Sequence, residues 1–149
     1  MNRVLAYDPG LLPTMPAPQG GEAIELRVSG LPPYKDTSFS IRNPKHKHHE
    51  RFVALRAAAI EAMAGRAWSH GAIGLDLEVH APNLEPGRTL VDYLAGVMDT
   101  LDGSHGTHFT YLPVAYNDDC QVCDSACIFN RSEDEWYAVQ IRFLANSGM

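Results

Sequence analysis

The sequence predicts an α+β fold, in which two main helices pack on a small mixed sheet of three to four strands. Three segments alternate apolar with polar residues, as half-buried strands do, and two others repeat apolar residues every three and four positions, as one face of a helix does. The 149 residues are 45% hydrophobic and 20% charged, which suits one folded domain with one core.

The N-terminal part of the chain differs from the rest in composition. Four prolines fall between Asp8 and Gly21. Because each proline fixes φ and removes a backbone donor, neither a helix nor a central strand suits this segment. We therefore expect residues 1–22 to be a flexible arm and residues 23–149 to form a single domain.

The first half of that domain is expected to contain a strand, a loop and a helix. Ile24–Val28 alternates apolar and charged residues and predicts a strand, which Gly30-Leu31-Pro32-Pro33 ends. Tyr34–Lys47 has no clear period and is expected to be a polar loop. Glu50–Arg66 predicts the first helix, because its apolar residues fall on one face.

The second half is expected to add two strands and a helix. Ile73–Val79 alternates and predicts a strand, and Thr89–Leu101 predicts a helix that Asp102-Gly103 ends. Ser104–Asn117 is expected to be an irregular or hairpin-like insertion. Cys120–Ile128 is expected to include a short strand or turn, and Trp136–Phe143 predicts the last strand.

Charge and hydropathy restrict the class of protein. The net charge is -6, so a nucleic-acid binder with this composition must concentrate its twelve Lys and Arg residues locally. No apolar run reaches eighteen residues, which excludes a membrane-spanning helix, and the N-terminus lacks the apolar core of a signal peptide. With an odd number of cysteines as well, we expect a cytoplasmic protein.

Carboxylates form the first candidate site. Asp118 and Asp119 are adjacent, Asp92 lies in the first turn of the second predicted helix, and Asp99 lies about two turns further along the same side. Converging carboxylates can hold Mg²⁺, which activates water and stabilises charge on a phosphate. The alternative is structural: Asp92 would favour the helix N-terminus, and Asp118-Asp119 would be a solvated turn.

The second candidate is a cysteine cluster. Cys120, Cys123 and Cys127 could bind zinc with His105 or His108 as a fourth ligand, or could pack as small apolar groups. Zinc sites usually draw on a second, distant pair of ligands, so zinc is the less favoured cofactor.

The third candidate is a basic neighbourhood around Lys45-His46-Lys47-His48-His49. Most of its charge comes from lysine and arginine, which favours contacts with a phosphate backbone over metal binding. The residues expected to contact DNA are Arg42, Lys45, Lys47 and Arg51. The alternative is a solvated loop before the first helix.

Taken together, these segments resemble the RusA-type crossover-junction endonucleases, small magnesium-dependent nucleases that resolve Holliday junctions as dimers. Gly30-Leu31-Pro32-Pro33 is similar to the family's strand-to-Pro-Pro loop, and Val91–Leu101 is similar to its Asp-containing helix. Asp118-Asp119-Cys120-Gln121-Val122 is similar to its Asp-Asp-x-Gln-Val motif. The resemblance covers residues 24–144 and implies a homodimer, Mg²⁺ or Mn²⁺ as cofactor, and Asp92, Asp118 and Asp119 as catalytic metal ligands.

The chain also departs from that family. In an ungapped alignment, Thr89 and Val91 stand where the family has two metal-binding aspartates, Asp92 stands where it has asparagine, and Ala95 replaces a lysine. A one-residue gap would let Asp92 take the place of the second aspartate, but Leu90 would then still be unable to ligate metal. The insertion at residues 104–115 is longer than is usual in the family. Valine cannot ligate Mg²⁺, and threonine is a poor substitute for a carboxylate.

Three hypotheses for function follow. The first is a RusA-like, Mg²⁺-dependent endonuclease that hydrolyses phosphodiester bonds in Holliday junctions or other branched DNA during recombination and repair. The second is a catalytically degenerate relative that binds DNA or a protein partner without cleaving. The third is a zinc-binding module built on Cys120, Cys123 and Cys127.

Overall fold

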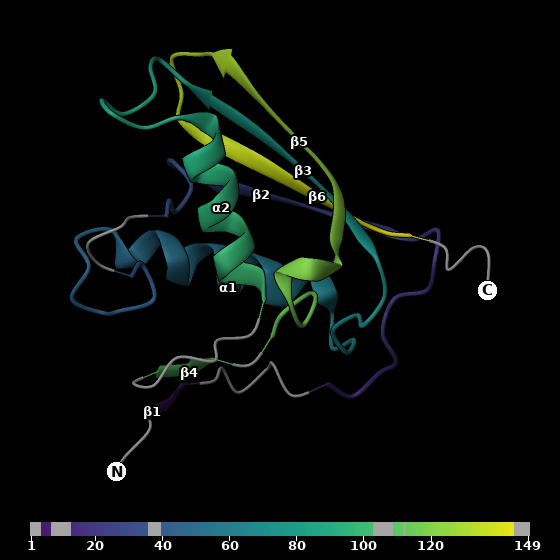
Figure 1. Ribbon diagram of the computed structural model, residues 1–149. Coiled ribbons are helices and arrows are strands. Elements are labelled where there is room, and N and C mark those ends of the chain that lie inside the picture. The colour runs from purple at the N-terminus through teal and green to yellow at the C-terminus, as the bar shows by residue number, and fades with distance from the viewer. Residues whose placement is uncertain (1–3, 7–12, 36–39, 103–108, 112, 145–149) are drawn as a thin grey trace.

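The main sheet has four strands in the order β2-β6-β3-β5. They are β2 (Ala23–Ser29), β3 (Ile73–Ala81), β5 (Val122–Arg131) and β6 (Trp136–Phe143). β6 pairs antiparallel with β2 and β3, and β5 runs parallel to β3, so the sheet is mixed. The computed structural model describes residues 4–6, 13–35, 40–102, 109–111 and 113–144. The sheet and its two helices confirm the predicted α+β class (Figure 1).

One face of the sheet is buried and the other is open. Because side chains alternate along a strand, β2 and β6 each present every second residue to the core. The buried residues of these two strands are Ile24, Leu26, Val28, Tyr137, Val139, Ile141 and Phe143. Both helices lie on this side of the sheet (Figure 1). The opposite face carries exposed or half-buried polar side chains such as Glu25, Asp76 and Arg142.

The first helix, α1, spans His49–Met63 and buries Phe52, Leu55 and Ala59. It ends three residues before the predicted end at Arg66, because Ala64 adopts a left-handed conformation with φ of 53° and its amide donates back to the carbonyl groups of the last turn. A left-handed residue after the last turn is a common helix terminator.

The second helix, α2, spans Leu90–Leu101, with Thr89 as its N-cap, and agrees closely with the prediction. The segment that contains Pro33 and Tyr34 crosses it at Gly96. A Cβ atom at position 96 would lie 2.3 Å from the carbonyl oxygen of Pro33, so only glycine allows this close approach. No helix among the described residues is both long and apolar enough to cross a bilayer.

β5 is longer than the sequence predicted. A short strand or turn was expected within Cys120–Ile128, whereas the structure has a 3-10 turn, η1 (Asp119–Gln121), followed by a strand of ten residues. β5 lies at the edge of the sheet, and most of its residues are exposed or half-buried. An edge strand of this kind has no strict apolar alternation, which is the signal that predicts other strands.

A small second sheet joins two distant parts of the chain. β1 (Val4–Ala6) pairs in parallel with β4 (Phe109–Tyr111). Residues 103–108 and 112 of the predicted insertion, and residues 7–12 of the predicted arm, lie outside the described residues. Further along the arm, the amides of Thr14 and Met15 both donate to the carbonyl oxygen of Gly65.

Candidate metal centre

Four carbonyl groups at the C-terminal end of α2 accept hydrogen bonds from other segments of the chain. The last four carbonyl groups of an α-helix have no partner within the helix. Here each accepts a hydrogen bond from another segment: Met98 from Tyr116 Oη (3.1 Å), Asp99 from Arg42 (2.7 and 3.1 Å), Thr100 from Arg56 Nη1 (3.4 Å), and Leu101 from the amides of Val114 and Ala115 (3.1 and 3.3 Å). The end of the helix is therefore fixed relative to α1 and to the segment that leads into η1.

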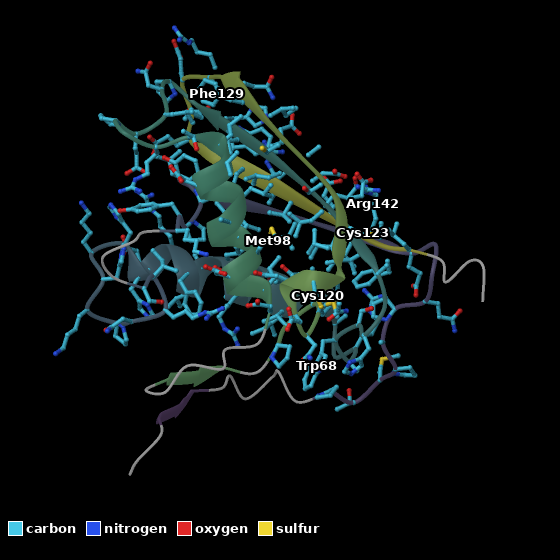
Figure 2. All side chains as sticks on the ribbon, viewed as in Figure 1. Trp68, Met98, Cys120, Cys123, Phe129 and Arg142 are labelled. Carbon is cyan, nitrogen blue, oxygen red and sulfur yellow. The ribbon has the colours of Figure 1, made fainter. Side chains whose placement is uncertain are left out.

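Three carboxylates meet at this helix end. Asp99 lies in the last turn of α2, Asp102 is its C-cap, and Asp119 is the first residue of η1. One oxygen atom from each carboxylate lies within 4.8 Å of those of the other two. Figure 2 shows Cys120, the next residue of η1, beside the end of α2 that carries Met98. We call Asp99, Asp102 and Asp119 the carboxylate triad; it is the group with metal-binding geometry among the described residues.

Gln121 positions the turn that carries Asp119. Its Oε1 accepts from the amides of Asn117 (2.8 Å) and Asp118 (2.9 Å), and its Nε2 donates to the carbonyl groups of Ser69 and Gly71 (2.8 Å each). These bonds join η1 to the chain that precedes β3. The side chain of Asp118 completes the turn by accepting from the amide of Cys120 at 3.0 Å. The glutamine of the Asp-Asp-x-Gln-Val pattern thus has a structural role in this chain.

Replacing Gln121 with alanine is expected to lower the free energy of unfolding by about 2 kcal/mol, because four hydrogen bonds are lost and two amides of the turn lose their acceptor. Urea denaturation measures this change. Gln140→Ala, on the open face of the sheet, is the control and should change the stability by no more than about 0.5 kcal/mol. Equal effects of the two substitutions would contradict the positioning role of Gln121.

Burial and mutual repulsion raise the pKa of two members of the triad, Asp99 and Asp102. The pKa of Asp102 rises to about 8, mainly because the carboxyl is buried, and further because the carboxylate of Asp119 lies within hydrogen-bonding reach. Burial likewise raises the pKa of Asp99, against the opposing effect of Arg42. Burial beside these carboxylates also raises the pKa of Tyr116 well above its ordinary value. A divalent cation would relieve this repulsion and displace the protons.

The raised pKa of Asp102 gives a stability that depends on pH in an unusual direction. The unfolded chain loses this proton near pH 4, whereas the folded protein keeps it up to about pH 8. The folded state therefore binds more protons in this window, and the free energy of unfolding falls as the pH rises, by up to about 1.4 kcal/mol per pH unit.

We expect Asp102→Asn to remove most of this decline and to be more stable than the wild type at pH 8 in metal-free buffer, because asparagine cannot ionise. Urea denaturation from pH 5 to pH 9 measures both slopes. Asp134→Asn, an exposed carboxylate, is the control and should keep the wild-type slope. Parallel profiles for wild type and Asp102→Asn would refute the assignment.

The structure places the three predicted site aspartates in different surroundings. Asp119 joins the triad. Asp118 caps η1. Asp92 accepts from the amide of Thr89 at 3.0 Å and forms a capping box with it at the start of α2, about 10 Å along the helix axis from Asp99.

Sequence reasoning missed Asp102 and noted Asp99 only for its alignment with Asp92. The spacing of Asp99 and Asp102 could have indicated the site, because residues three apart at a helix end lie on the same side of the helix. The sequence predicts that Asp102-Gly103 ends the helix, and Asp102 is indeed its C-cap. The carboxylate of the same residue also belongs to the triad.

The four basic residues predicted to contact DNA fall into two groups. Lys45 and Lys47 are exposed. Arg51 forms a two-pronged ion pair with Glu85, at 2.7 and 3.1 Å. Arg42 contacts the carboxylate triad, with Nη2 at 2.8 Å from Oδ1 of Asp102. The basic segment, residues 42–47, therefore begins at the carboxylate triad with Arg42 and continues to the exposed Lys45 and Lys47.

The cysteines do not have the geometry of one zinc site. Cys123 and Cys127 lie four residues apart on β5, roughly 13 Å at the usual rise of a strand, whereas two thiolates on one zinc ion lie within about 4 Å of each other. The thiol of Cys123 donates to the carbonyl oxygen of Ile73 at 3.6 Å. His105 and His108, the other suggested ligands, lie outside the described residues.

Compared with models of protein families and with curated protein sequences, the chain matches none of them. The resemblance to RusA-type nucleases therefore stays a prediction that depends on the motifs quoted above.

Proposed function

We propose that this protein is a RusA-like, Mg²⁺-dependent endonuclease that acts on Holliday junctions or other branched DNA. One observation supports it above the others. Asp119, from the most specific motif of the resemblance, lies with Asp99 and Asp102 in a group of carboxylates spaced within reach of a single ion. In this chain, the end of α2 would supply the ligands that Thr89 and Val91 cannot supply at its beginning.

The chemistry of the triad suits a small, hard cation. Mg²⁺ prefers oxygen ligands and keeps several of its waters, so three carboxylates leave room for water and for a phosphate oxygen. When bound, the ion supplies an activated water and stabilises charge on the scissile phosphate. Tyr116, whose Oη lies 3.5 Å from Asp119 Oδ1, helps to fix the orientation of that carboxylate.

The basic segment would hold the DNA. Lys45 and Lys47 are exposed on the same segment that Arg42 attaches to the triad, so a backbone contacting these lysines would run toward the proposed ion. The proposal includes the homodimer that the resemblance implies, since two paired sites are needed to resolve a four-way junction. It also includes a cytoplasmic location, in agreement with three free cysteines.

The proposal is tested by incubating the full-length protein with a labelled four-way DNA junction in Mg²⁺ or Mn²⁺. Nicked products are expected with either ion and none in chelator. A linear duplex of the same sequence is the control for structure specificity. Absence of products at high protein concentration, in both ions, would refute cleavage.

A second candidate is a DNA-binding relative that does not cleave. The observation that favours it is at the start of α2, where Val91 is 66% exposed and the carboxylate of Asp92 is engaged in the capping box. Junction binding that weakens steeply with salt, without any nicking, would identify this function. Absence of binding at low salt would exclude it.

A further inference from the structure

Arg42 places a guanidinium group on the carboxylate triad itself. Its Nη2 donates to Oδ1 of Asp102 at 2.8 Å, and its Nε and Nη2 donate to the carbonyl oxygen of Asp99 at 3.1 and 2.7 Å. The side chains of Arg42 and Asp102 are 22% and 11% exposed. Because the pair is largely shielded from water, salt screens its attraction only weakly.

The position of Arg42 bears directly on cation binding. A divalent ion held by the triad would share the carboxylate of Asp102 with the guanidinium, and two cations at one carboxylate repel each other. In the absence of a metal ion Arg42 partly compensates the triad, since its charge acts against the rise that burial causes in the pKa of Asp99 and of Asp102. One side chain therefore offers the triad the same kind of charge that a metal ion would.

We propose that Arg42 is an internal counter-cation that competes with a divalent metal ion for Asp102, so that metal binding displaces its guanidinium from that carboxylate. This inference rests on the proposed function, in that the same three carboxylates hold the ion. Arg42 belongs to the segment that carries Lys45 and Lys47, so the displaced guanidinium is close to where a DNA phosphate would arrive, and a phosphate oxygen can replace Asp102 as its acceptor.

The competition is tested by measuring free Mn²⁺ by electron paramagnetic resonance during titration of the full-length protein. Arg42→Met removes the guanidinium while keeping an apolar stem of similar length. We expect Arg42→Met to bind Mn²⁺ at least tenfold more tightly than the wild type, and Arg42→Lys to stay within about threefold of it because the charge is kept. Arg27→Met, on the open face of the sheet, changes the net charge equally and should bind as the wild type does.

The outcomes separate this inference from the proposed function. Tighter binding by Arg42→Met alone supports the competition, even if wild-type binding is too weak to measure. If the wild type binds Mn²⁺, Asp119→Asn does not, and Arg42→Met is unchanged or weaker, the metal site stands and the competition is refuted. If neither the wild type nor Arg42→Met binds Mn²⁺, both the metal site and the competition are refuted.

A measurement on the wild type covers the case in which Arg42→Met does not fold. In the metal-free protein the fork held by Asp99 and Asp102 should slow rotation of the guanidinium and give two resolved Nη resonances for Arg42. Saturation with Mg²⁺ should shift the Nη2 resonance, because Nη2 loses Asp102 as an acceptor while its bond to Asp99 persists. An Nη2 resonance that is unchanged at saturating Mg²⁺ would overturn the proposal.

Discussion

Replacing Asp119 with asparagine is expected to lower the rate of junction cleavage by at least about 100-fold and to abolish measurable Mn²⁺ binding. Asparagine has nearly the same shape as aspartate but carries no charge, so the triad loses one of its three anionic ligands while η1 keeps its backbone conformation. The turn is capped by Asp118 and Gln121 and not by Asp119, so the variant should fold normally. Single-turnover cleavage and Mn²⁺ titration measure the two effects.

Two matched substitutions make this prediction specific. Asp118→Asn keeps the capping group of η1, because asparagine is as good an N-cap as aspartate. Asp92→Asn changes a carboxylate about 10 Å from Asp99. Both are expected to bind Mn²⁺ within about threefold of the wild type, because each removes one charge outside the triad. A loss at Asp92 as large as that at Asp119 would instead place the ion at the beginning of α2.

Gly96→Ala is expected to lower the free energy of unfolding by about 3 kcal/mol or more. The new Cβ would lie 2.3 Å from the carbonyl oxygen of Pro33 and 2.5 Å from Cα of Tyr34, and both are backbone atoms that cannot rotate away. Overpacking of a tight core costs about 1–3 kcal/mol, and backbone overlap lies at the upper end of that range. Alanine favours a helix over glycine by about 1 kcal/mol, which offsets only part of the cost.

Chemical denaturation of Gly96→Ala measures this cost, and Gly71→Ala is its control. A Cβ at position 71 would meet nothing closer than 3.7 Å, an ordinary contact distance, so the control should remain near wild-type stability. A Gly96→Ala variant as stable as the wild type would mean that α2 and the Pro32–Tyr34 segment can separate at little cost. In that case the position of the triad at the end of α2 would be less fixed than its contacts suggest.

The fold was predictable where burial imposes a period on the sequence. β2, β3 and β6 each have one buried face, and α2 has one buried stripe, so their residues alternate or recur as the geometry demands. β5 lacked that signal because an edge strand with exposed residues on both faces can tolerate almost any alternation. The order of the strands and the pairing of β1 with β4 depend on contacts between distant segments, which a local pattern does not contain.

The candidate site was predictable only in part, for a related reason. Asp119 was found through its motif, but a motif does not say which other carboxylates approach it. Asp102 comes close to Asp119 because the amides of Val114 and Ala115, in the segment that leads into η1, bond to the carbonyl oxygen of Leu101, the residue before Asp102. Arg42 lies 60 residues from Asp102 in sequence, and its predicted role in DNA contact gave no indication of that ion pair.

The satisfied carbonyl groups at the end of α2 have a consequence for ion discrimination. Since each of them already accepts a hydrogen bond and keeps at most one lone pair for a further partner, the proposed ion would be coordinated mainly by carboxylates and water. Ca²⁺ takes six to eight oxygen ligands and often recruits carbonyl groups, whereas Mg²⁺ tolerates a small protein share and keeps its waters. The hydrogen bonds that terminate this helix would therefore favour Mg²⁺ over Ca²⁺ by leaving few backbone oxygens for coordination.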